Sequence, residues 1–130
     1  MTAENKSFNS LLKYTFGAHA VVALVFGVPM LLAPGQFLGV FDWAPIDPLL
    51  SRLLGAALIG LAWSSVRGFM ADYWSRVSIT VEAEIVFCVL GCIGILRHLL
   101  IAGYPWMVWL TFVTLLIFAV LWIIAYFTNR

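Results

Sequence analysis

The feature that most constrains this chain is the apolar run at residues 77–101. At about 1.5 Å of rise per residue, a helix of this length crosses the roughly 30 Å hydrocarbon core of a bilayer. The run therefore predicts a membrane-spanning helix, and the positions of its few polar residues become informative.

Polar and small residues gather on one face of this predicted helix. At about 100° per residue, a single line runs along the helix through Thr80, Glu84, Cys88, Gly91, Ile95 and His98. Glu82 lies on the opposite, apolar face. An ionisable side chain in hydrocarbon is costly unless it is paired or hydrated, so we expect Glu84 to find a partner or water inside a helix bundle.

Composition extends this interpretation to the whole chain. Hydrophobic residues make up 64% of the 130 positions and charged residues 10%, against about 25% charged in soluble domains. This excludes a water-soluble globule and leaves no room for a soluble catalytic or nucleic-acid-binding domain. We expect an all-α fold, a polytopic integral membrane four-helix bundle, with residues 1–130 as a single membrane domain. The predicted spans are residues 11–33, 48–68, 77–101 and 105–127, with an interfacial loop at 34–47.

The connections constrain the topology. Residues 34–48 mix turn formers with Phe and Trp, which favour the headgroup region, so a short interfacial helix at 36–41 is an option. Asp47 and Pro48 have the pattern of an N-cap and a first helical residue. The short connectors at 69–76 and 102–105 predict that spans two and three, and spans three and four, are antiparallel neighbours.

Small residues recur every four positions in two spans. The first span carries His19, Ala23 and Gly27 in such steps, which favours close helix approach. The second span carries a longer ladder of Ala56, Gly60, Ser64 and Gly68. We expect this ladder to be a helix contact face, within the bundle or between protomers.

Basic residues are distributed unevenly between the two ends of the predicted bundle. The end that holds both termini carries Lys6, Lys13, Arg67, Arg76 and Arg130, whereas the other carries Arg52 and Arg97. Because basic residues are more frequent on the cytoplasmic side of membrane proteins, the five basic residues at one end against two at the other predict that both termini are cytoplasmic.

His19 and Glu84 are each about eight residues from the same end of parallel spans, so we expect them at one depth. A functional interpretation is a proton-handling or cation-binding pair, because an imidazole and a desolvated carboxylate can both titrate near neutral pH. The alternative is a structural interhelical hydrogen bond, or an acid drawn to water at the interface.

At the other end, Arg52, Arg97 and His98 are positioned to cluster with Asp42 and Asp47. Guanidinium forks suit phosphate and carbonyl oxygens, so one hypothesis is an anchor for a lipid phosphate or for a quinone-like head. The alternative is a set of salt bridges that tie the loops.

No cofactor or metal is expected. A bis-histidine haem would need His19 and His98 at one depth, but their offset of some thirteen residues is about 20 Å along the membrane normal. Cys88 and Cys92 lie one helical turn apart, where geometry is poor for a disulfide, and they read as small packing residues. No glycine-rich phosphate loop, catalytic triad or paired metal motif is present.

Residues 52–62 (RLLGAALIGLA) resemble the corresponding helix of DoxX-like small four-helix bacterial membrane proteins and related uncharacterised families. Two further features are similar to these families. The first span ends at Pro34, which Phe37 follows, and the third span ends in Gly94-x-x-Arg97. The resemblance covers most of the chain and implies a four-helix membrane bundle, in families that include accessory proteins. Glu82 and Glu84 are not part of that pattern.

We therefore expect a non-enzymatic integral membrane protein, either an accessory subunit of a membrane complex or a binder of a lipid-like ligand. The alternative is a homo-oligomeric small-molecule or proton-coupled transporter that uses Glu84 and His19. A redox or other membrane enzyme is a third class. Expected partners are membrane lipids and a homo-oligomer or larger complex, with no nucleic acid, and the expected location is the bacterial inner membrane.

Overall fold

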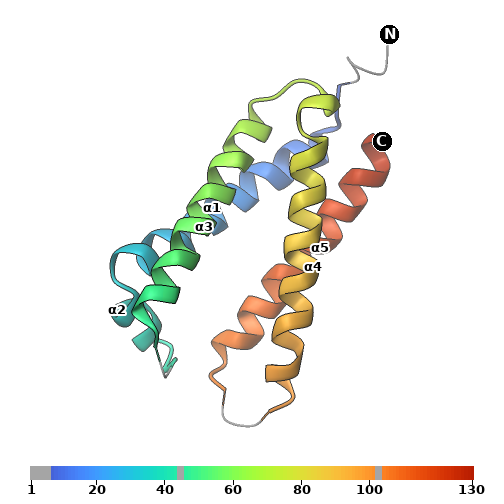
Figure 1. Ribbon diagram of the computed structural model, residues 1–130. Coiled ribbons are helices and arrows are strands. Elements are labelled where there is room, and N and C mark those ends of the chain that lie inside the picture. Colours follow the sequence, from blue (N-terminus) through green and yellow to red (C-terminus); the bar gives the residue numbers. More distant parts are fainter. Residues whose placement is uncertain (1–6, 44–45, 102–103) are drawn as a thin grey trace.

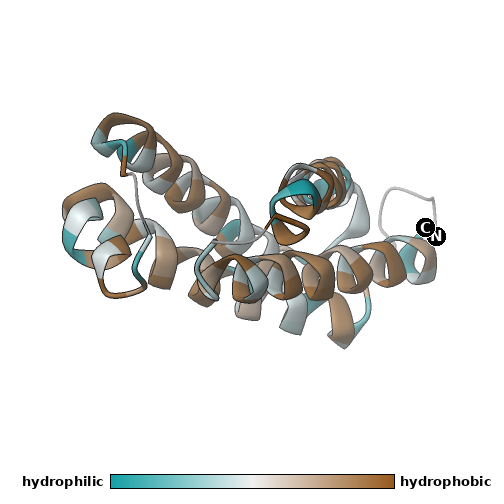
Figure 2. Ribbon diagram, turned by 90° about the horizontal axis from the view of Figure 1, so that it is seen from below, coloured by the Kyte–Doolittle hydropathy of each residue, from teal (hydrophilic) through white to brown (hydrophobic). Residues whose placement is uncertain are grey.

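The computed structural model describes residues 7–43, 46–101 and 104–130. Its elements are helical throughout this part of the chain: α1 (Ser10–Leu32), α2 (Pro34–Gly39), α3 (Pro48–Phe69), the 3-10 turn η2 (Trp74–Arg76), α4 (Ser78–Leu99) and α5 (Met107–Asn129) (Figure 1). Four of the helices are long and apolar enough to cross a membrane. Their bounds agree within two residues with the predicted spans. Hydrophobic residues run along the length of these helices in Figure 2.

Local sequence explains where the helices begin and end. The Asp47 side chain accepts hydrogen bonds from the backbone N–H groups of Leu49 and Leu50 at 2.9 and 3.0 Å, and Pro48 follows as the first helical residue. This confirms the predicted cap. The short helix expected at residues 36–41 forms slightly earlier, as α2, because Pro34 both stops α1 and suits a first helical turn.

The helices pack as two antiparallel pairs, α1 with α3 and α4 with α5. The pairs meet through α1 and α5, where the rings of Phe16 and Trp122 lie edge to face with centroids 4.9 Å apart. The predicted hairpin of the third and fourth spans is confirmed. The second and third spans, predicted to be antiparallel neighbours, do run antiparallel, but α3 and α4 make few contacts and separate away from their connector in Figure 1.

Glycines set how closely α1 approaches α3. A Cβ atom at Gly55 would lie 2.6 Å from the backbone nitrogen of Leu31 and 2.8 Å from the carbonyl oxygen of Gly27. The backbones of the two helices therefore touch here without an intervening side chain. The predicted close approach along Ala23 and Gly27 is confirmed, since Ala23 is 4% exposed.

The contact face of α3 differs from the predicted small-residue ladder. The buried residues of α3 are Ser51, Gly55, Ala62, Ser65 and Gly68. Ala56 and Gly60 are exposed, and a Cβ atom at Gly60 would meet nothing within 4 Å. Strict four-residue steps drift around a helix of 3.6 residues per turn, so only the Gly68 end of the ladder reaches α1. As a contact within the bundle, the ladder prediction is wrong for Ala56 and Gly60.

The beginning of α1 and the end of α5 are tied together by polar side chains. The backbone N–H of Asn9 donates to Asn129 Oδ1 at 2.8 Å, and Asn9 Nδ2 donates to Thr128 Oγ1 at 3.1 Å. The α3–α4 connector lies at this same end (Figure 1). Of the five basic residues assigned to it, Lys6 lies outside the described residues. Which side of a membrane this end faces stays a prediction.

Candidate functional site

His19 lies where all four long helices meet. Its ring is buried at 5% exposure in α1, and Nδ1 is hydrogen-bonded at 2.8 Å to the hydroxyl of Ser65 from α3. Nε2 lies 3.5 Å from Glu84 Oε2 of α4. From α5, Phe118 and Trp122 pack edge-on against the imidazole, with ring centroids at 4.9 and 5.6 Å. The structure thus brings together the two residues that the sequence placed at one depth.

Glu84 is fully buried, with 0% exposure, and its carboxylate is poorly satisfied. Neither oxygen has a hydrogen-bond partner among the described residues, and Trp122 Nε1 also lacks one. The 3.5 Å separation from His19 Nε2 is within ion-pair range but exceeds the roughly 2.7–3.2 Å of an N–H···O hydrogen bond. The pair is therefore in electrostatic contact without a formed hydrogen bond.

The two glutamates of α4 have different environments, as the helical periodicity predicts. Glu82 is exposed, whereas Glu84 points into the bundle. Cys88 follows Glu84 on the buried face at 1% exposure, and Cys92 is half-buried. Both cysteines are free thiols, and the described part of the chain contains no group of three His, Cys, Asp or Glu residues that would hold a metal ion.

The hydrogen bond between His19 Nδ1 and Ser65 determines, in each tautomer, what Nε2 presents to Glu84. If Nδ1 accepts from the Ser65 hydroxyl, Nε2 carries the hydrogen and directs it toward Glu84. If Nδ1 donates to Ser65, the Nε2 lone pair faces the carboxyl group and can accept a hydrogen bond from its protonated form. Ser65 can donate or accept, so it accommodates both arrangements. Chemically, this is a carboxyl group beside an imidazole inside an apolar core.

The candidate cluster at the opposite end is not assembled. Arg52, Arg97 and His98 are exposed, and no ion pair within residues 7–43, 46–101 and 104–130 joins either arginine to Asp42 or Asp47. The Asp47 carboxylate caps α3 instead. His98 Nδ1 lies 3.3 Å from its own helix, at the carbonyl oxygen of Gly94. A ligand-binding role for this cluster stays a prediction.

The sequence analysis missed Ser65 as the partner of His19. It named only the neighbouring Ser64, as a member of the four-residue ladder. The structure buries Ser65 at 0% exposure and leaves Ser64 half-buried. At about 100° per residue, Ser51, Gly55, Ala62 and Ser65 fall within about 80° of arc, so a second face of small residues was present in the sequence. That Ser65 meets His19 depends on how α3 packs against α1.

Comparison of this chain with protein-family models, with curated proteins and with solved structures finds no match. The resemblance to DoxX-like proteins stays a prediction, and the site must be interpreted from its own chemistry.

Proposed function

We propose that the protein is a non-enzymatic integral membrane protein that binds and releases a proton at the His19–Glu84 pair, as the coupling site of an oligomeric carrier. Four helices of membrane-spanning length and apolar composition support the insertion. The observation that carries the proposal is the fully buried Glu84 carboxylate, 3.5 Å from His19 Nε2 and without a hydrogen bond within the described residues.

The energetic argument is that this arrangement is costly for a structural contact. A polar group buried without a hydrogen bond costs about 1–3 kcal/mol in protein mutational data, and a charge costs more. A buried ion pair can often be replaced by apolar residues of similar volume without loss of stability. An acid and a base held this way in the membrane interior are therefore best explained by what they bind, and the proton is the ligand they share.

Transport also requires that water or substrate reach the pair. Glu84 is closed off in this conformation, but it lies where the α1–α3 pair meets the α4–α5 pair. Rocking of one helix pair against the other is a movement that would open the site, as repeats do in alternating access. Because four helices enclose little volume, the carrier would work as a homo-oligomer.

The proposal is tested by infrared spectroscopy of the purified protein in lipid bilayers as the pH is varied. A buried protonated carboxyl group gives a C=O stretching band, and its pH dependence should disappear in Glu84→Gln. Glu82→Gln is the matched control, because it removes an exposed carboxyl group two residues away and should leave the band in place. A band that survives Glu84→Gln unchanged would refute proton binding at this pair.

A second candidate function, an accessory subunit of a larger membrane complex, is favoured by the exposed part of the α3 ladder. Ala56 and Gly60 leave room for another helix to approach, because nothing lies within 4 Å of a Cβ atom at Gly60. Purification in mild detergent separates the two functions. A stable heteromeric complex that Gly60→Leu disrupts would favour the subunit, and a homo-oligomer with an intact infrared signal would favour the carrier.

A further inference from the structure

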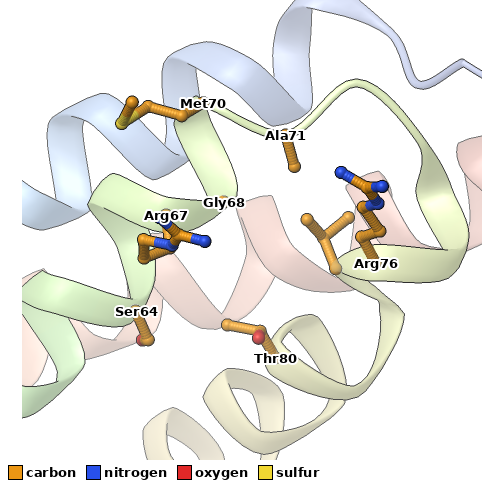
Figure 3. A pocket seen from close by; sticks show the side chains of 8 residues that line it. Ser64, Arg67, Gly68, Met70, Ala71, Arg76 and Thr80 are labelled. Carbon is orange, nitrogen blue, oxygen red and sulfur yellow. The ribbon is translucent and has the colours of Figure 1, made fainter.

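A hollow with several polar lining residues lies between the end of α3 and the beginning of α4 (Figure 3). Its volume is about 380 Å³, within the roughly 300–1,000 Å³ range of small-molecule sites. The hollow is lined by Ser64, Arg67, Gly68, Met70, Ala71, Arg76, Val77 and Thr80. None of these residues belongs to the His19–Glu84 pair, so the hollow requires its own explanation.

The charge of the hollow is positive and not neutralised by its lining. Arg67 and Arg76 stand on opposite sides of it in Figure 3, and none of the described residues that line it is acidic. Arg67 has no ion pair with any described residue. The Arg76 guanidinium lies 5.9 Å from the centre of the Tyr73 ring, a contact that holds the side chain but does not cancel its charge.

A hydroxyl group adds a neutral hydrogen-bond donor. Thr15, Thr111 and Thr128 each donate to a backbone carbonyl four residues earlier, at 2.9 Å. Thr80 makes no such bond in the described part of the chain, and its hydroxyl has no other hydrogen-bond partner there. Its hydroxyl is therefore available to a ligand.

The N-terminus of α4 borders the hollow and also favours an anion there. No side chain caps it, and Val77, the residue before the helix, lines the hollow. Uncapped N–H groups at a helix N-terminus favour an anion. Ser64 is not a donor here, since its hydroxyl donates to the carbonyl oxygen of Leu61 at 2.8 Å.

We propose that this hollow binds a phosphate group, held by the guanidinium groups of Arg67 and Arg76 and by the Thr80 hydroxyl. Arginine forks match phosphate oxygens in two-point hydrogen bonds. Arg67 lies two residues before the end of α3 and Arg76 two residues before the beginning of α4. In the membrane orientation proposed above, that is the level of lipid headgroups. The phosphate belongs either to an anionic phospholipid or to a water-soluble phosphate compound.

The test measures binding of phosphatidylglycerol, of phosphatidylcholine and of inorganic phosphate to the purified full-length protein by native mass spectrometry. We expect phosphatidylglycerol to bind, and Arg67→Gln with Arg76→Gln to weaken it by about tenfold or more. The matched control is Lys13→Gln, which removes an exposed positive charge at the same end of the bundle that does not line the hollow and should leave binding unchanged. Competition by inorganic phosphate would identify a water-soluble ligand, and its absence a lipid headgroup.

Lysine variants distinguish a site that binds phosphate through specific hydrogen bonds from a general attraction of anionic lipids to positive charge. Arg67→Lys with Arg76→Lys keeps both charges but loses the forks, and Thr80→Val loses only the hydroxyl. Each should weaken binding if the proposal is correct. Equal binding by the lysine variant, an equal loss in the Lys13→Gln control, or no binding of any of the three probes would overturn it. Circular dichroism of each variant verifies that the helices remain folded.

Discussion

The close contact of α1 with α3 at Gly55 gives the sharpest test of the packing. In Gly55→Ala the new methyl group would lie 2.6 Å from Leu31 N and 2.8 Å from Gly27 O, against about 3.5–4.0 Å for an unstrained contact. The two backbones must separate by roughly 1 Å to admit it, which forfeits a quarter to a half of the local dispersion energy. Overpacking of this kind costs about 1–3 kcal/mol.

Gly60→Ala is the matched control, because the same methyl group at Gly60 meets nothing within 4 Å. Both changes gain about 0.8–1 kcal/mol of helix propensity, so this contribution cancels in the comparison. We expect Gly55→Ala to be less stable than Gly60→Ala by about 1–3 kcal/mol. The assay is equilibrium unfolding in mixed micelles with increasing sodium dodecyl sulfate, followed by tryptophan fluorescence. Equal free energies of unfolding would refute the backbone contact.

Three other features can be tested in the same way. Glu84→Leu should leave the free energy of unfolding unchanged or raise it by about 1–3 kcal/mol, because it removes an unsatisfied buried group; a large loss would show that the carboxylate is structural. Asn9→Ala should lower it by about 0.5–2 kcal/mol, since Asn9 caps α1 and binds the end of α5, and a neutral effect would contradict that role. A cysteine added after Arg130 should be unreactive to an impermeant thiol reagent outside intact cells, and labelling there would reverse the predicted topology.

The helices themselves could be predicted from the sequence because length and hydropathy determine them. An apolar run of twenty-odd residues between turn formers has few alternatives, and the Asp47–Pro48 cap locates the beginning of α3. The orientation of Glu84 could be predicted as well. A carboxylate among apolar neighbours has only one low-energy direction, and helical spacing gives that direction relative to Glu82.

The pairing of the helices could not be predicted, and the reason is physical. In a soluble bundle, hydropathy separates the core from water, but in lipid both sides of a helix are apolar. Leu53, Leu54 and Trp63 of α3 are exposed in this structure, whereas its buried face consists of small residues such as Gly55 and Ser65. Helix pairing then depends on shape, and the contact of Gly27 with Gly55 is not visible as a difference in hydrophobicity.

The same argument explains why Ser65, Phe118 and Trp122 were missed around His19. Each is a common residue for a membrane helix, and each becomes part of the site only because α3 and α5 pack against α1 at that depth. A site assembled from four helices can be inferred from its costly members, the histidine and the carboxylate. The other residues of the site carry no such energetic cost, so they can be identified only when the packing of the helices is known.

The His19–Glu84 pair also connects the two halves of the bundle, and this leads to a last prediction. His19 and Ser65 belong to the α1–α3 pair, and Glu84 belongs to the α4–α5 pair, so their electrostatic contact crosses the interface between the halves. The other contacts between the halves lie mainly between α1 and α5, and α3 and α4 make few contacts, so the His19–Glu84 pair is a direct restraint on the position of α4. In Glu84→Gln the attraction is lost while each helix pair keeps its own packing.

We therefore expect Glu84→Gln to broaden the distance distribution between spin labels at Leu53 of α3 and Ile93 of α4. Both positions are exposed, at 59% and 63%, and both lie away from the connector between these helices. Pulsed electron paramagnetic resonance in lipid nanodiscs measures the distribution, and Glu82→Gln provides the control with the same chemical change on the exposed face. If the distribution stays as narrow in Glu84→Gln as in the control, the pair does not hold the halves together. The rocking movement proposed for transport would then lose its link to the proton.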